Sequence, residues 1–161
     1  EFRRVLFRSQ DIHACLKNYT ARNIIITGGE PTIQPHLETL LDSLKAADYK
    51  LCIETNGLNP VPPQIDYIAT SPKACYAEKY HKQCIDEADE VRIVADGDML
   101  AFCEAMERKI RARHYYLSPC EQNGEMNIYD TIRQIGLLNS RSDAPVHWQL
   151  SVQTHKWAGI E

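Results

Sequence analysis

Six short apolar runs, rich in β-branched residues, recur along the chain and constrain its fold more than any other feature. Each run is nearly continuous in its apolar character, which is typical of strands buried on both faces of a parallel sheet. We therefore predict six strands, at residues 23–27, 50–55, 66–71, 90–94, 114–118 and 147–152.

Segments with a helical period separate most of these runs. In each of three such segments, apolar side chains recur on one helical face. They are Leu37, Leu40, Leu41 and Leu44 in residues 35–44; Leu100, Cys103, Met106 and Ile110 in residues 98–111; and Ile128, Ile132, Ile135 and Leu138 in residues 126–138. Strands that alternate with helices predict an α/β fold, in which right-handed crossovers build a mainly parallel sheet or a partial barrel.

Small, polar or ionisable residues follow most of the predicted strands. Because ligands bind where the strands of such a sheet or barrel end, we expect these residues to converge on one rim. The segments are 27–31 (TGGEP), 54–57 (ETNG), 71–73 (SPK), 118–121 (SPCE) and 153–156 (QTHK). We predict that the stretch at residues 74–86 is a polar loop.

The chain has 161 residues and a formal net charge of −4. Its first nine residues, EFRRVLFRS, show no cap, turn or period, so we interpret residues 1–9 as a non-native junction, with a frayed native strand as the alternative. They carry a net charge of +2, which leaves residues 10–161, predicted to form one domain, at −6. This acidic segment is a poor nucleic-acid binder, because affinity for phosphates comes mainly from clustered Lys and Arg.

No apolar run approaches the roughly 18 residues that a bilayer-spanning helix needs, and the N-terminus lacks the pattern of a signal peptide. We therefore expect a cytoplasmic protein with no membrane partner.

The six cysteines, at positions 15, 52, 75, 84, 103 and 120, show neither CxxC pairs nor the spacing of a zinc site. We predict neither a disulfide framework nor a complete metal site. Cys75, His81 and Cys84 are interpreted as structural residues. Cys120 follows a predicted strand, but no histidine lies near it in sequence to activate its thiol.

Gly28 and Gly29 can adopt conformations with positive φ and let a ligand approach the main chain. Glu30 beside them offers an acceptor for an ammonium group, so the segment suits a ligand that carries both an amine and a carboxylate. The alternative is a turn before a helix, with Pro31 at an early helical position and Glu30 interacting favourably with the helix dipole. These residues alone support both interpretations.

Three other strand ends also allow two interpretations. Ser71 and Lys73 suit a ribose hydroxyl or a carboxylate, or they form a Ser-Pro turn with a solvated lysine. Glu54 offers a carboxylate to a ribose, or it belongs to a turn that uses Asn56. His155 follows the last predicted strand, although a lone histidine is usually a surface residue or a satisfied core residue.

Four motifs taken together carry a family resemblance. They are residues 19–22 (YTAR), 27–31 (TGGEP), 71–73 (SPK) and 150–156 (LSVQTHK). GGEP alone points only to the radical SAM superfamily. The order and spacing of all four, over nearly all of residues 10–161, resemble the 7-carboxy-7-deazaguanine synthase family within it.

The resemblance implies a partial radical SAM βα barrel and a carbon–nitrogen lyase reaction. The family contracts 6-carboxy-5,6,7,8-tetrahydropterin to 7-carboxy-7-deazaguanine with loss of ammonia, a step toward queuosine, using S-adenosylmethionine, a reduced [4Fe-4S] cluster and Mg²⁺. The resemblance places Thr27 and the terminal Glu161 at the pterin, and a full-length member is expected to form a homodimer. The implied cofactor-binding residues are Gly29, Glu30, Ser71, Pro72, Lys73, Ser118, Pro119, Cys120 and Glu121.

The sequence departs from the family pattern at the cluster site. The family's cysteine triad, the neighbouring Thr that meets Mg²⁺ and a Glu/Arg segment that holds the pterin have no counterpart here. Cluster cysteines must converge on three irons, whereas these six are scattered. We expect a C-terminal fragment that neither holds a cluster nor turns over alone. The alternatives are another radical SAM enzyme, such as a glycyl-radical activase, and a non-catalytic nucleoside-binding module.

Overall fold

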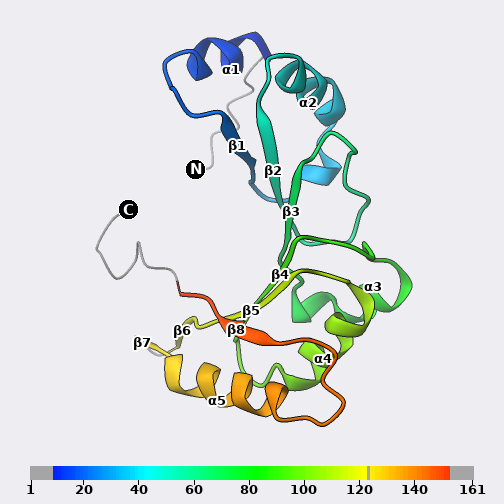
Figure 1. Ribbon diagram of the computed structural model, residues 1–161, viewed down its shortest axis with the longest axis vertical. Helices are drawn as coiled ribbons and strands as arrows, with labels where there is room; N and C mark the ends of the chain where they lie inside the picture. The colour runs from blue at the N-terminus through cyan, green and yellow to red at the C-terminus, as the bar shows by residue number, and fades with distance from the viewer. Residues whose placement is uncertain (1–8, 123, 153–161) are drawn as a thin grey trace.

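The computed structural model describes residues 9–122 and 124–152 and contains one six-stranded parallel sheet (Figure 1). Its strand order is β1-β2-β3-β4-β5-β8, so each strand pairs with the next one along the chain apart from the β6–β7 hairpin. The sheet strands are β1 Asn23–Ile26, β2 Lys50–Thr55, β3 Tyr67–Thr70, β4 Glu90–Val94, β5 His114–Ser118 and β8 Trp148–Leu150. All six lie within the predicted runs, which confirms the α/β class and the parallel sheet.

Five α-helices connect or precede the strands in the described part of the chain. They are α1 Ser9–Leu16, α2 Leu37–Ala46, α3 Ala77–Lys82, α4 Leu100–Lys109 and α5 Ile128–Asn139. Two 3₁₀ turns, η1 Pro31–Ile33 and η2 Ala74–Tyr76, follow β1 and β3, and a short antiparallel hairpin joins β6 Glu121–Gln122 to β7 Glu125–Met126. The expected junction at residues 1–9 lies outside the described residues except for Ser9, which begins α1.

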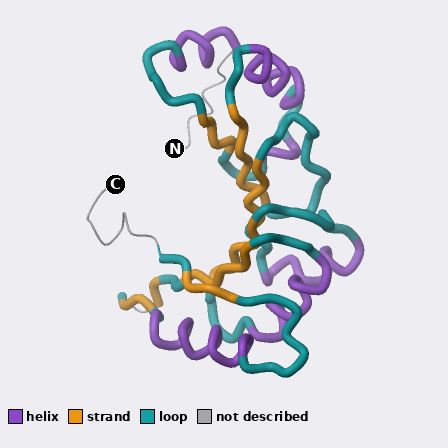
Figure 2. Tube along the Cα trace, in the orientation of Figure 1, coloured by secondary structure: helices purple, strands orange, loops and turns teal. Residues whose placement is uncertain are grey.

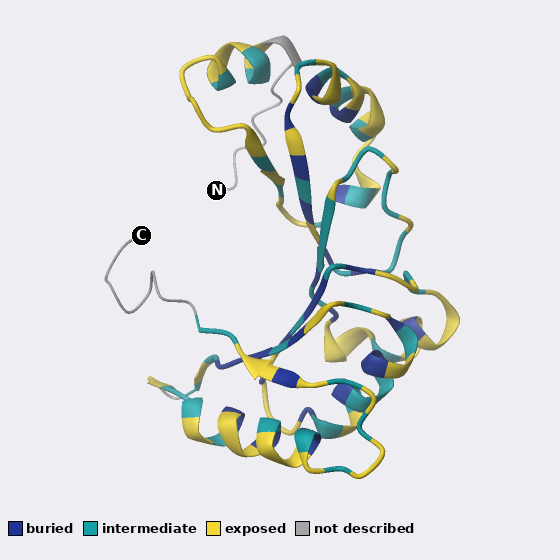
Figure 3. Cartoon of the chain, viewed as in Figure 1, coloured by how far each residue is buried: buried dark blue, intermediate teal, exposed yellow. Residues whose placement is uncertain are grey.

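The sheet is curved, and the helices from α2 to α5 lie on its convex side (Figure 2). Burial follows the pleat: in β2, Leu51, Ile53 and Thr55 are buried, whereas Cys52 is half-buried and Glu54 is exposed (Figure 3). The expectation that the strands are buried on both faces is therefore wrong. Helices cover only the convex face, and the concave face carries the polar side chains that alternate with the core residues.

Two apolar clusters hold the helices against the convex face. One packs α2 on β2 through Leu41, Leu44 and Leu51. The other joins α4 and α5 to β4, β5 and β8, with Trp148, Leu117 and further buried side chains at its centre. Together they fix the curvature of the sheet and so the positions at which the strands end.

The predicted apolar face of α5 differs from the observed one. Ile132 is 49% exposed, and the fully buried polar side chains of Thr131 and Gln134 take its place. Gln134 Oε1 accepts from Met99 N at 2.8 Å, and its Nε2 donates to Gly97 O at 2.9 Å. These bonds turn the helix so that Gln134 faces the loop before α4.

The prediction of a polar loop at residues 74–86 is also wrong, because η2 and α3 lie there. Tyr80 anchors this segment: its ring is 1% exposed and packs near Phe102, and its hydroxyl donates to Asn56 O at 2.8 Å. Tyr80 is the one buried residue of α3, so the helix lacks the repeated apolar positions from which a helix is predicted in a sequence. Among the described residues, no helix has the length and apolar character needed to cross a membrane.

Candidate functional site

A cavity of about 570 Å³ lies where the strands end on the concave face. We call it the rim cavity. Its polar lining comes from all six sheet strands or the segments that follow them, namely Thr27, Glu54, Thr55, Asn56, Thr70, Ser71, Lys73, Glu90, Arg92, Ser118 and Ser151. Gly28, Gly29 and several apolar or small residues complete the wall. Residues 27–29, 54–56, 71, 73 and 118 of the predicted strand ends converge on this cavity, whereas residues 119–121 do not line it and residues 153–156 lie outside the described residues.

The segment after β1 presents open backbone to the cavity. Gly28 has a φ of +136°, and a Cβ built on either Gly28 or Gly29 meets no other atom within 4 Å. Thr27 Oγ1 donates to Glu54 Oε2 at 3.0 Å, which places a hydroxyl and a carboxylate side by side at the ends of neighbouring strands. This side of the cavity can meet both donors and acceptors of a ligand.

Glu30 lies behind this segment and is engaged by its own chain. Its Oε1 accepts from the Thr32 hydroxyl at 2.6 Å and the Thr55 hydroxyl at 2.7 Å, and its Oε2 accepts from Asn56 N at 2.7 Å. Burial alone would raise the pKa of Glu30, but these hydrogen bonds together lower it. Glu30 also accepts from Thr32 N and so caps η1. Glu30 therefore joins the ends of β1 and β2, and its contact with a ligand ammonium group stays a prediction.

Two of the three residues of the segment after β3 line the rim cavity. Ser71 N donates to Thr55 O at 2.8 Å, which fixes the start of the segment against β2. Lys73 Nζ donates to Ser71 Oγ at 3.0 Å, so a cation and a hydroxyl stand together at the wall. Pro72 between them is buried, and it shapes the turn rather than lining the cavity.

The residues at the end of β5 and just after it differ in whether they line the rim cavity. Ser118 lines the cavity and Pro119 is buried. Cys120 Sγ donates to Ala95 O at 3.4 Å, and Cys120 N donates to Asn127 Oδ1 at 2.8 Å. Glu121 is exposed and begins β6. Only Ser118 of these four predicted residues is therefore part of the cavity wall.

Sequence reasoning missed the floor of the cavity. Glu90 and Arg92 project from β4 into it, joined by an ion pair of 2.6 Å. A signal was present, because two charged residues alternate with Val91 and Ile93 in an otherwise apolar run, which is typical of a strand with one polar face. Of the other predictions, Gln153, Thr154, His155, Lys156 and Glu161 lie outside the described residues.

The cysteines do not fit a [4Fe-4S] cluster. They lie on α1, β2, η2, the loop before β4, α4 and the segment between β5 and β6, and all six are free thiols. The part of the chain that the structure describes, which includes all six, contains no group of three His, Cys, Asp or Glu side chains that could hold a metal ion. The rim cavity has open glycine backbone, hydroxyls and Lys73, which are groups that can bind a ligand with an amine, a carboxylate or ribose hydroxyls.

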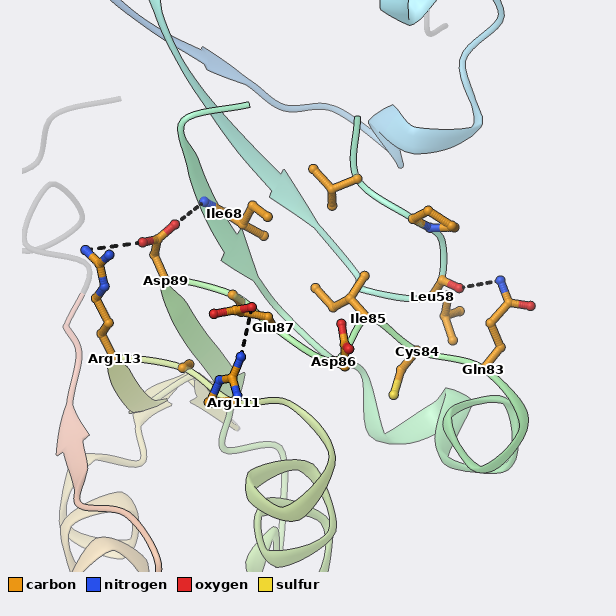
Figure 4. Close-up of a pocket in the computed structure, with 14 residues that line it drawn as sticks. Leu58, Ile68, Gln83, Cys84, Ile85, Asp86, Glu87, Asp89, Arg111 and Arg113 are labelled. Carbon is orange, nitrogen blue, oxygen red and sulfur yellow. Dashed lines mark hydrogen bonds and ion pairs between the residues drawn. The ribbon is translucent and has the colours of Figure 1, made fainter. Parts of the chain in front are cut away.

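A second cavity of about 800 Å³ lies away from the rim, on the convex side (Figure 4). Leu58 and Ile85 are apolar residues of its wall, and the charged residues Glu87, Asp89 and Arg111 line it from the segments before β4 and β5. Arg111 pairs with Glu87 at 3.0 Å, and Asp89 accepts from Ile68 N at 2.8 Å. The connection from β2 to β3 contains no helix, so this cavity is a gap in the helical layer.

No family model matches the chain, but individual proteins do. It is 82% identical over 151 residues to the 7-carboxy-7-deazaguanine synthase of Neisseria meningitidis, and the match covers 94% of this chain and 71% of that protein. The synthase of Haemophilus influenzae is 59% identical, with 91% and 69% covered. The crystal structure of QueE from Escherichia coli superposes with a TM-score of 0.60 at 25% identity, covering 91% of this chain and 64% of that one. The chain belongs to the 7-carboxy-7-deazaguanine synthase family.

Proposed function

We propose that this chain provides cofactor- and substrate-binding residues for the radical SAM ring contraction of 6-carboxy-5,6,7,8-tetrahydropterin to 7-carboxy-7-deazaguanine. The observation that carries the proposal is the convergence of Thr27, Gly29, Ser71, Lys73 and Ser118 on one cavity. The family resemblance implies that these residues contact the substrate and the cofactor, and relatives named for this product support the reaction.

The rim cavity offers each part of the cofactor a chemically matched group. The exposed backbone at Gly28 and Gly29 accepts or donates hydrogen bonds at the methionine end, and Ser71 with Lys73 suits a carboxylate or a ribose hydroxyl. S-adenosylmethionine, when bound to a reduced cluster, supplies the radical that starts the rearrangement. Thr27, held by Glu54 at 3.0 Å, would orient the pterin beside it.

We infer that the chain alone does not catalyse this reaction. Its six cysteines are distributed over separate elements, so they cannot converge on one cluster without rearrangement of the fold. Binding of the nucleoside and of the pterin does not depend on those thiols, because none of the six cysteines lines the rim cavity. Ligand binding and turnover are therefore separable properties of this chain.

A chimera tests the proposed reaction. The segment of the Neisseria meningitidis synthase that aligns with this chain is replaced by the matching residues from this sequence, and the parent synthase is the control. We expect the chimera to form 7-carboxy-7-deazaguanine, detected by mass spectrometry. The reason is that the rim cavity of this sequence would supply the cofactor and substrate contacts that the replaced segment made. A folded chimera that holds its cluster and cleaves S-adenosylmethionine but forms no such product would overturn the proposal.

A further inference from the structure

Arg92 stands on the floor of the rim cavity with its orientation already fixed. Its Nη2 donates to Glu90 Oε1 at 2.6 Å, and Tyr67 donates its hydroxyl to the other Glu90 oxygen at 3.2 Å. The guanidinium also lies over the ring of Tyr116, 5.9 Å from its centroid. Three neighbouring strands therefore hold one cation in place.

The Glu90 side chain is the buried partner and Arg92 the accessible one. Glu90 has 11% of its side chain exposed, against 42% for Arg92. Burial of a carboxylate costs free energy unless a cation and hydrogen-bond donors compensate it, and Arg92 and the Tyr67 hydroxyl are the groups that do so for Glu90. Arg92 keeps a solvent-accessible part that faces the cavity.

The donors of Arg92 are not used up by the protein. A guanidinium carries five N–H groups in a fixed planar fork. Its Nε is inaccessible to solvent and has no acceptor among the described residues, and Glu90 takes a hydrogen bond at Nη2. Because Nε is inaccessible, an incoming group would meet the accessible end of the fork, Nη1 and the second N–H of Nη2, for which the described residues supply no acceptor.

We propose that Arg92 binds the carboxylate of a ligand in the rim cavity. The proposal rests on the proposed function, since both ligands named there carry a carboxylate. A planar fork held in one orientation matches a carboxylate with two parallel hydrogen bonds, which a monodentate or spherical anion cannot form. The carboxylate comes either from the amino-acid part of the cofactor or from the 6-position of the pterin.

Two pairs of ligands separate these sources. S-adenosylhomocysteine is compared with 5′-methylthioadenosine, which lacks the amino-acid part, and 6-carboxypterin is compared with pterin. Binding of each ligand to the full 161-residue chain is measured by NMR titration for the wild type, Arg92→Gln and Arg92→Lys. Arg133→Gln is the matched control, because Arg133 is an exposed α5 residue paired with Asp130 outside the cavity.

We expect Arg92→Gln to lower the affinity for one carboxylate-bearing ligand by about tenfold or more. The affinity for the carboxylate-free ligand of the same pair should change by less than about twofold. The pair that shows the effect identifies the source of the carboxylate. Arg92→Lys keeps the charge but not the fork, so its loss should be intermediate, and Arg133→Gln should change nothing. The backbone amide spectrum reports whether each variant is folded.

Either of two results would overturn the role of Arg92, and only the second would also contradict the proposed function. If the wild type binds these ligands and Arg92→Gln binds both members of each pair as well as the wild type does, Arg92 has no such role and the proposed function stands. If the wild type binds none of the four ligands, the rim cavity is not their site, and the binding part of the proposed function falls as well.

Discussion

The carboxylate of Glu30 accepts a hydrogen bond of 2.7 Å from the hydroxyl of Thr55, and this contact ties the segment after β1 to the end of β2. The same carboxylate accepts from Asn56 N and from both the amide and the hydroxyl of Thr32. The geometry of the open Gly28 and Gly29 backbone therefore depends on a side chain that does not itself line the rim cavity.

Glu30→Gln should destabilise the chain by about 1–3 kcal/mol. A carboxamide has one acceptor oxygen, whereas the two carboxylate oxygens of Glu30 accept from Thr32 N, from the hydroxyls of Thr32 and Thr55, and from Asn56 N. Urea denaturation followed by circular dichroism measures this. Glu78→Gln, at an exposed position of α3, is the control and should change the free energy of unfolding by less than about 0.5 kcal/mol.

The same pair of proteins reports the pH dependence. A carboxylate whose pKa is lower in the folded state stabilises the fold above its unfolded pKa, and this contribution is lost as the pH falls through the folded value. The difference between wild type and Glu30→Gln should therefore be largest at neutral pH and shrink below 4.5, the ordinary pKa of Glu30. A difference that grows toward acid pH would contradict the assignment.

Gly57→Ala should cost about 2–4 kcal/mol, since it combines two penalties. Gly57 has a φ of +77°, and an added Cβ would lie 2.5 Å from the buried Thr70 Oγ1. Gly97→Ala is the matched control: its φ is +90° but nothing lies within 4 Å of the added Cβ, so it should cost only about 1–2 kcal/mol. Equal losses in thermal or urea unfolding would show that the contact with Thr70 is not rigid.

Glu107→Ala should cost about 3–5 kcal/mol, because Glu107 is a fully buried carboxylate in the core. Its two oxygens accept from Trp148 Nε1 and from Arg141, each at 2.7 Å, so the variant leaves an indole N–H and a guanidinium without this partner. Glu104→Ala, in which one third of the side chain is exposed, should cost less than about 1 kcal/mol. Urea unfolding measures both losses, and a similar loss for the two variants would contradict a larger structural role for Glu107 than for Glu104.

Anaerobic reconstitution with iron and sulfide should leave this chain without the absorption of an iron–sulfur cluster. The reason is the distribution of its cysteines: Cys103, for example, is fully buried in α4, and burial raises the pKa of its thiol to about 12, which opposes the thiolate that iron requires. Iron and sulfide analysis measures the stoichiometry. One [4Fe-4S] cluster bound per chain would refute the prediction.

Strand positions could be predicted from sequence because each strand is a dense apolar run with little competing pattern, as in Lys50–Thr55. Burial on one face could also have been read in Glu90–Val94, where Glu90 and Arg92 alternate with apolar residues. The helix α3 could not be predicted in this way, because its packing against the rest of the fold depends on one buried residue, Tyr80. The orientation of α5 depends on Gln134 bonding to residues more than 30 positions away, which no local period encodes.

The candidate site divides in the same way. The positions of residues that follow strands, such as Thr27 and Ser71, could be predicted, because parallel strands end on one edge of a sheet. Both residues line the rim cavity. The position of Glu30 behind the rim depends on Thr55 and Asn56 from the next strand, so its local motif could not show it.

Binding of the nucleoside cofactor in the rim cavity can be measured by an amide NMR titration of this chain with S-adenosylhomocysteine. We expect saturable shifts at the amides of Gly28, Gly29, Ser71 and Lys73, which line one cavity. Shifts confined to residues of the convex-side cavity, such as Ile85, or no saturable shifts at all, would contradict it.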